Sequence, residues 1–185
     1  MTAGELKWLE DVAYKREQRR GYASSRDTWR HGIISNPTYV GCVGEHAAAK
    51  YLSQRLGVRI EIDTEDRPNG DGGVDIVVFG VRIQVKTRTR DVRPPMVLLK
   101  RADEQGKLIR MKWDYCAHAT WERDENPYAV NLDGYLSKKE AEDYGAYCKG
   151  RRGDWKNLEY DFRRLHPIAE LVDVLKINRD LKGVG

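Results

Sequence analysis

The chain has 185 residues, of which 40% are hydrophobic and 34% are charged, and its formal net charge is +4. This length fits one domain with extensions, and the hydrophobic content is enough for a modest core. The sequence holds no apolar run of the ~20 residues that span a bilayer, and its N-terminal segment is too charged for a secretory signal. We therefore expect an intracellular, cytoplasmic protein with no membrane segment. Three widely spaced cysteines lack the pairing of zinc or redox motifs and indicate reduced thiols: Cys42, Cys116 and Cys148.

Two helices are expected in the first third of the chain. Apolar residues recur with helical spacing among charged ones, which predicts a helix over 5–20 followed by a loop. A second helix is expected over 37–56. Asn36 is suited to cap it, Pro37 to open its first turn and Gly57 to follow its end. Its small residues would let a sheet or a nucleic-acid backbone approach closely: Gly41, Gly44, Ala47 and Ala48.

Short strands are expected through the middle of the chain. Their predicted ranges are 58–62, 74–79, 81–87, 96–101, 107–113, 114–121, 128–132 and 158–162. Only Gly80 separates the second strand from the third, which indicates a tight hairpin. The fourth and fifth are expected to form another hairpin. Ser137 and Glu140 have the spacing of a capping box and predict a helix, and Pro167 opens a last amphipathic helix.

This order of elements favours an α/β fold, with a central mixed β-sheet flanked by helices. We expect the domain to occupy residues 36–176. A basic helical extension over 1–35 would precede it, and a tail over 177–185 would follow it.

Charge is distributed unevenly along the chain. Six acidic residues and one basic residue lie between positions 61 and 75, whereas ten basic and three acidic residues lie between 82 and 112. A segment able to collect cations therefore adjoins one able to hold phosphates, although a solvated charged surface would give the same pattern.

The stretch 72–87 contains the residues best suited to catalysis. Side chains alternate across a strand, so Gln84 and Lys86 share one face. Because the preceding strand returns through a short turn, Asp75 is expected at about the level of Lys86 on the neighbouring strand. A carboxylate, an amide oxygen and an ammonium group would thus meet at one end of the sheet.

Such a group of side chains is suited to the cleavage of phosphodiesters. Asp75 and the Gln84 carbonyl are hard oxygen ligands for Mg²⁺, which keeps several waters and also binds substrate phosphate. Lys86 would orient or deprotonate a metal-bound water, or offset the charge that develops on the phosphate.

This string resembles the PD-(D/E)XK nuclease superfamily, with Asp75 as its acidic residue and Gln84-Val85-Lys86 as its (D/E)XK element. The upstream Gly44-Glu45-His46-Ala47-Ala48 resembles the helix that supplies a further glutamate to the metal site in many members. The resemblance covers roughly residues 37–90 and implies a restriction-endonuclease-like fold. It also implies Glu45, Asp75 and Gln84 as metal ligands, with Lys86 as the fourth catalytic residue and Mn²⁺ able to replace Mg²⁺. Gln84 stands where an acidic residue is more usual, which removes one negative charge from the site.

Several polar residues follow Lys86 and would lie where a DNA backbone could pass: Thr87, Arg88, Arg90 and Arg93. They would supply affinity without sequence information, although ordinary charges of an edge strand explain them equally well. The histidines His46, His118 and His166 have no metal-site spacing and are expected to be structural. The five tryptophans are expected mainly in the core.

The sequence thus predicts a Mg²⁺-dependent DNA endonuclease. Two alternatives stay open. One is a nucleic-acid-binding protein of the same fold with weak or no catalysis, and the other is a nuclease directed at RNA or at one DNA structure. Both a monomer and a homodimer are compatible with the sequence.

Overall fold

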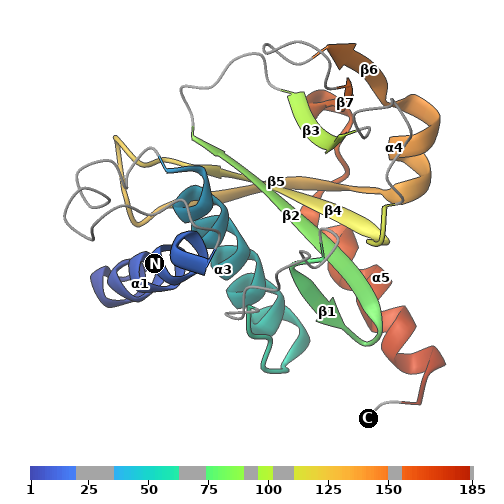
Figure 1. Cartoon of the computed structure of the whole chain (residues 1–185). Coiled ribbons are helices and arrows are strands. Elements are labelled where there is room, and N and C mark those ends of the chain that lie inside the picture. The colour runs from blue at the N-terminus through green and yellow to red at the C-terminus, as the bar shows by residue number, and fades with distance from the viewer. Residues whose placement is uncertain (20–35, 63–73, 90–95, 102–110, 150–155, 184–185) are drawn as a thin grey trace.

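The computed structural model describes residues 1–19, 36–62, 74–89, 96–101, 111–149 and 156–183. In these parts of the chain, helices and two β-sheets form a mixed α/β fold (Figure 1). The expectation of a mixed sheet flanked by helices is confirmed. None of the described helices combines the length and the apolar character that crossing a membrane requires.

The described part of the chain contains four α-helices, which are α1 (Ala3–Arg19), α3 (Pro37–Leu56), α4 (Lys138–Tyr144) and α5 (Ile168–Leu181). The ends of α3 agree with the sequence. The Asn36 side chain accepts hydrogen bonds from the backbone N–H groups of the first turn, and Gly57 closes the helix with a φ of 69°. Ser137 and Glu140 form the predicted capping box of α4.

The main sheet has four strands in the order β1-β2-β4-β5. Their bounds are Ile76–Val78, Val81–Thr89, Tyr115–Trp121 and Val130–Ser137. β1 and β2 form the predicted antiparallel hairpin, β4 runs parallel to β2, and β5 runs antiparallel to β4. The parallel pair sets Gln84 beside Cys116 and Lys86 beside His118, so side chains from two strands share one face.

A second sheet has three antiparallel strands in the order β3-β7-β6 (Figure 1). They span Met96–Arg101, Lys156–Asp161 and Ala146–Lys149. β3 pairs with β7, which is remote in sequence, and residues 111–113 form no strand. The expected strand over 107–113 is therefore wrong at its C-terminal end, and the rest of that hairpin lies outside the described residues.

The strand predicted over 58–62 is also wrong. The segment alternates apolar and charged residues, but its backbone pairs with no strand in the described structure. Instead, the Ile60 N–H donates to Ser53 Oγ at 2.9 Å, and Ile62 packs into the core. The segment therefore returns along the end of α3 rather than joining a sheet.

The core lies on both faces of the main sheet. On one face, apolar residues of α1, α3 and α5 pack together with the strands, among them Leu9, Leu52 and Leu171. On the other face, a smaller cluster forms around Trp113, Cys116 and Leu136, with Tyr160 of β7. Gln84 and Lys86 of β2 share this second face with Cys116 and His118 of β4.

Candidate active site

Asp75 lies just before β1, at the edge of β2. Its backbone N–H donates to the carbonyl of Ile83 at 2.9 Å. Its carboxylate Oδ2 accepts a hydrogen bond of 2.6 Å from the Val85 N–H. β1 pairs only with residues 81–83 of β2, and no strand of the described structure pairs with this edge of β2 beyond them, where the Asp75 carboxylate takes that place. The carboxylate is thereby fixed at the residue between Gln84 and Lys86.

Gln84 presents a buried oxygen beside this carboxylate. The side chain is 7% exposed, and its Oε1 accepts no hydrogen bond within the described residues. An unsatisfied buried acceptor costs free energy unless some partner supplies the missing interaction. The Gln84 oxygen is therefore suited to a ligand, and an amide carbonyl is one of the oxygen donors that divalent cations accept.

The charges of Asp75 and Lys86 both affect the pKa of the buried Cys116 thiol. Complete burial raises the pKa of this thiol to about 12, while the charge of Lys86 lowers it and the charge of Asp75 raises it by smaller amounts. Asp75 and Lys86 thus act on the same buried atom, which sits beside Gln84 in the register of β2 and β4. The two residues belong to one electrostatic neighbourhood.

Helix α3 approaches this part of β2 closely. A Cβ atom on Gly44 would lie 1.8 Å from Thr87 Oγ1, so only glycine fits at this point of contact. The Thr87 hydroxyl is buried and has no hydrogen-bond partner in the described structure. The next residue of the helix, Glu45, contacts Arg16 of α1. The predicted role of small residues on this helix, to admit a sheet, agrees with this packing.

Glu45 is buried and ion-paired. Its side chain is 10% exposed, and its two oxygens accept hydrogen bonds from Arg16 of α1 at 3.2 and 2.9 Å. A third hydrogen bond from Arg16, of 3.2 Å, goes to the sulfur of Cys42. Burial alone would lower the pKa of the guanidinium, but the hydrogen bond and charge of Glu45 raise it above its usual value. The charge of Asp75 also raises the pKa of Arg16, so this cation lies within the fields of both carboxylates.

A polar network covers the same face of the sheet beyond Lys86. His118 Nδ1 lies 2.8 Å from Asp133 Oδ2, and Thr120 donates to the same oxygen at 2.7 Å. Arg88 donates from Nε to Thr120 Oγ1 at 3.2 Å, and its guanidinium lies 4.7 Å from the centre of the Phe162 ring. His118 therefore has a structural partner, as expected. Sequence reasoning missed Asp133 because only a bulge in β5 brings it to this face.

Of the residues predicted to contact a nucleic acid, the structure describes two. The hydroxyl of Thr87 faces α3 rather than the face that carries Lys86. Arg88 is held by Thr120 and Phe162. Arg90 and Arg93 lie outside the described residues.

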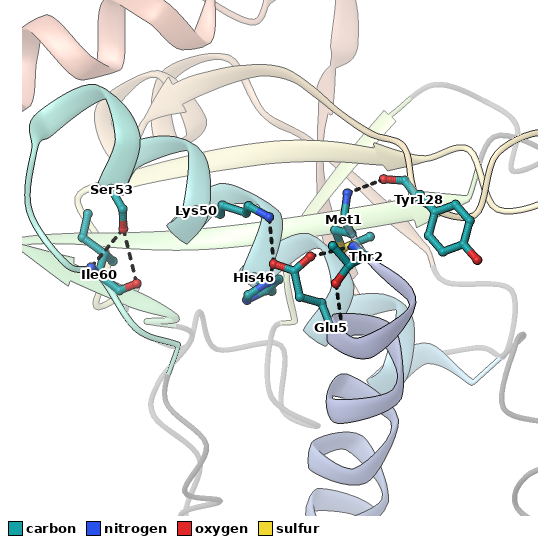
Figure 2. A network of polar contacts seen from close by, with 8 residues as sticks. All are labelled: Met1, Thr2, Glu5, His46, Lys50, Ser53, Ile60 and Tyr128. Atoms are coloured by element: carbon teal, nitrogen blue, oxygen red, sulfur yellow. Dashed lines mark hydrogen bonds and ion pairs between the residues drawn. The ribbon is translucent and has the colours of Figure 1, made fainter.

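The N-terminal half of α1 is fastened to α3 and to the loop before β5 by polar contacts (Figure 2). Glu5 accepts a hydrogen bond of 2.7 Å from Lys50 and lies 3.3 Å from His46 Nε2. The N-terminal ammonium of Met1 donates to the Tyr128 carbonyl at 2.7 Å. A cavity of about 610 Å³ opens beside these residues, between Trp8 and Ile62. Its lining includes none of the four predicted catalytic residues.

Comparison with known proteins identified no relative of this chain. No protein-family model, curated protein or solved structure matches the chain. Within the described residues, moreover, no three His, Cys, Asp or Glu side chains form a metal-binding cluster.

Proposed function

We propose that this protein is a Mg²⁺-dependent DNA endonuclease of the PD-(D/E)XK class, with a restriction-endonuclease-like fold. The proposal extends the mixed α/β architecture to a specific fold and assigns the chemistry to Glu45, Asp75, Gln84 and Lys86. DNA as the partner belongs to the same proposal.

One observation carries the proposal. The Asp75 carboxylate is hydrogen-bonded to the backbone N–H of Val85, the residue between Gln84 and Lys86. The (D/E)XK-like element and its upstream acidic residue therefore meet at one place on the sheet edge. This is the arrangement that the motif requires, because one cation must contact both Asp75 and residue 84 while Lys86 contacts the same phosphate.

The donor chemistry at this place suits a hard divalent cation. Asp75 offers a carboxylate, and Gln84 offers a buried carbonyl oxygen that has no partner in the described part of the chain. Glu45 offers a second carboxylate once it is released from Arg16. Bound Mg²⁺ would polarise the scissile phosphate and lower the pKa of a coordinated water.

The chain's own residues would perform the remaining tasks. The Val85 N–H fixes the orientation of Asp75, so the carboxylate does not have to reorganise on binding. Lys86, partly buried on the face shared with Gln84, would hold the attacking water or stabilise charge on the phosphate. The rigid β2–β4 pair keeps these groups at a constant spacing.

A second candidate function is binding without cleavage. It is favoured by the ion pair between Arg16 and Glu45 and by the neutral residue at position 84, which together lower the negative charge available to a metal. A protein of this kind would retain affinity for nucleic acid and leave its phosphodiesters intact.

A cleavage assay with the wild-type protein and the Lys86→Ala variant decides between these functions. With Mg²⁺ or Mn²⁺, the wild-type protein is expected to cut DNA, and Lys86→Ala is expected to lose at least ~10² to 10³ in rate. Binding and folding should be retained. Lys176→Ala, which removes an exposed lysine of α5, is the matched control and should cut normally.

The substrates should include linear, nicked and four-way-junction DNA with matched RNA, so that a structure-specific or RNA-directed nuclease is recognised. Equal cutting by wild type and Lys86→Ala would remove the catalytic assignment. Binding with no cutting of any substrate by the wild type would support the second candidate.

A further inference from the structure

Arg16 brings a positive charge from α1 into contact with one of the proposed metal ligands. Its two terminal nitrogens donate to the two oxygens of Glu45 at 3.2 and 2.9 Å. Both side chains are largely buried, with 13% of Arg16 and 10% of Glu45 exposed. A two-pronged contact of this kind occupies both carboxylate oxygens.

The position of Arg16 is fixed by the packing of its helix. Leu9 and Val12 of α1 are buried in the main core, and Glu5 and Met1 hold the start of the helix to Lys50 and Tyr128 (Figure 2). The guanidinium therefore cannot leave Glu45 through a small shift of the whole helix. A change in the Arg16 or the Glu45 side chain is needed to release the carboxylate.

The two negative and two positive side chains around the site cancel in formal charge. Asp75 and Glu45 are negative, Arg16 and Lys86 are positive, and Gln84 is neutral where an acidic residue would add a negative charge. A divalent cation entering this site meets one carboxylate already neutralised by a neighbouring cation. Coulomb repulsion from Arg16 acts at short range in a partly buried place, where solvent screening is weak.

We propose that the Arg16 guanidinium is a tethered cation that occupies Glu45 in the free protein and competes with the divalent metal for that carboxylate. Glu45 is then not a metal ligand until Arg16 moves away, and Arg16 limits capture of metal by the free protein. The inference rests on the proposed function, because it takes Asp75 and Gln84 as the place where metal binds. It makes Arg16 a positioning residue, which acts through Glu45.

The test is a titration of Mn²⁺ into the full-length protein without nucleic acid, followed by calorimetry and by the metal-induced rise in Tm. Arg16→Met is expected to bind Mn²⁺ about tenfold or more tightly than wild type, because a neighbouring charge commonly changes the affinity of a carboxylate for a cation by that factor. Lys15→Met removes an exposed positive charge from the same helix and should bind as wild type does. The double variant Arg16→Met/Glu45→Gln should return to the wild-type affinity.

Glu45→Gln provides an independent test that keeps Arg16, in case Arg16→Met does not fold. The amide still accepts a hydrogen bond from the guanidinium but no longer offsets its charge, so Mn²⁺ affinity is expected to fall, by less than tenfold, since an occupied carboxylate contributes little as a ligand. A loss of tenfold or more in this variant would show that Glu45 already binds metal and would overturn the inference. Arg16→Met binding no more tightly than Lys15→Met would overturn it as well.

Asp75→Asn separates failure of the inference from failure of the proposed function. This variant is expected to lose Mn²⁺ binding in either the wild-type or the Arg16→Met background. Metal binding that is unaffected by Asp75→Asn would contradict the proposed site itself, whatever Arg16 does.

Discussion

At the scale of single residues, Gln84 has a buried side-chain oxygen that lacks a hydrogen-bond partner in the described structure. A buried acceptor without a hydrogen bond costs ~1–3 kcal/mol, and the Gln84 oxygen is in this state within the described structure. The adjacent Cys116 sulfur does not relieve it, because its contact goes to the Ala117 carbonyl at 3.8 Å. A metal ligand at this position would use the acceptor that folding leaves unsatisfied. The Gln84 amide is neutral and adds no negative charge to the site.

Gly44 and Thr87 form another contact in which single atoms decide the structure. Substituting Gly44 by Ala would place a Cβ atom 1.8 Å from Thr87 Oγ1, so α3 must shift away from β2. We expect Gly44→Ala to lower the free energy of unfolding by ~1–3 kcal/mol, the usual cost of overpacking. Urea denaturation at neutral pH measures this change.

Gly41→Ala is the matched control for this prediction. The nearest atom to its Cβ would be Glu45 Oε1 at 3.8 Å, an ordinary contact, so this variant should be as stable as wild type or more so. Thr87→Ala combined with Gly44→Ala should recover part of the loss, because the closest atom is then gone. Equal stability of the two single glycine variants would contradict the proposed close contact.

At the scale of elements, α1 is both a core helix and the carrier of Arg16. Its apolar face packs with α3 through Leu9, Val12 and Ala13. Its two ends are held to α3 by ion pairs, Glu5 with Lys50 at one end and Arg16 with Glu45 at the other. The docking of α1 therefore affects the candidate site directly, although α1 contributes none of the motif residues.

The Glu5 anchor predicts an acid-sensitive contribution to stability. The hydrogen bond from Lys50, despite some burial, lowers the pKa of Glu5 from 4.5 to about 2. Because the folded-state pKa is depressed, this stabilisation is fully present above about pH 4.5 and is lost as the pH falls towards 2. Glu5→Gln should therefore lower the free energy of unfolding at neutral pH, by on the order of 1 kcal/mol because solvent screens this partly exposed pair.

Chemical denaturation of wild type and Glu5→Gln from pH 7 down to pH 2 measures this contribution. The two stability curves should converge as Glu5 becomes protonated. Glu142→Gln, which removes an exposed carboxylate of α4, controls for the loss of one charge. A difference between wild type and Glu5→Gln that stays constant down to pH 2 would show that the ion pair is not its source.

Elements with strong local signals could be predicted from the sequence. The helix from Pro37 to Leu56 is bounded by a side-chain cap and a left-handed glycine, and both act within a few residues. The β1–β2 hairpin follows from alternation on either side of a short turn. The segment 58–62 has equally suitable residues, yet it forms no strand, because a strand also needs a partner that its own sequence does not specify.

At the scale of the whole molecule, the part of the site formed by one local segment could be predicted, whereas the part that depends on contacts between distant segments could not. Asp75, Gln84 and Lys86 lie within one hairpin, so strand alternation was enough to group them. Arg16 and Glu45 come from different helices, and their contact depends on how α1 packs against α3. The pairing of β3 with β7 likewise joins segments that are distant in sequence, and no local sequence pattern predicts it.

The arrangement of layers gives the two sides of the main sheet different roles. One side is closed by α1, α3 and α5, and the other carries Gln84 and Lys86 with the His118–Asp133 network, under the second sheet (Figure 1). Asp75 lies at the strand edge, where the two sides meet. A metal held there would contact Asp75 at the edge, next to Gln84 and Lys86 of β2, which is why the edge position is central to the proposed function.

The most direct test of this site is anomalous X-ray scattering from crystals grown with a high concentration of Mn²⁺. The proposed function predicts an anomalous peak at about 2.1 Å from an Asp75 carboxylate oxygen and from Gln84 Oε1, the distance expected for a small divalent cation. A well-ordered Asp75–Gln84 site with no peak, or Mn²⁺ bound only elsewhere on the protein, would contradict it.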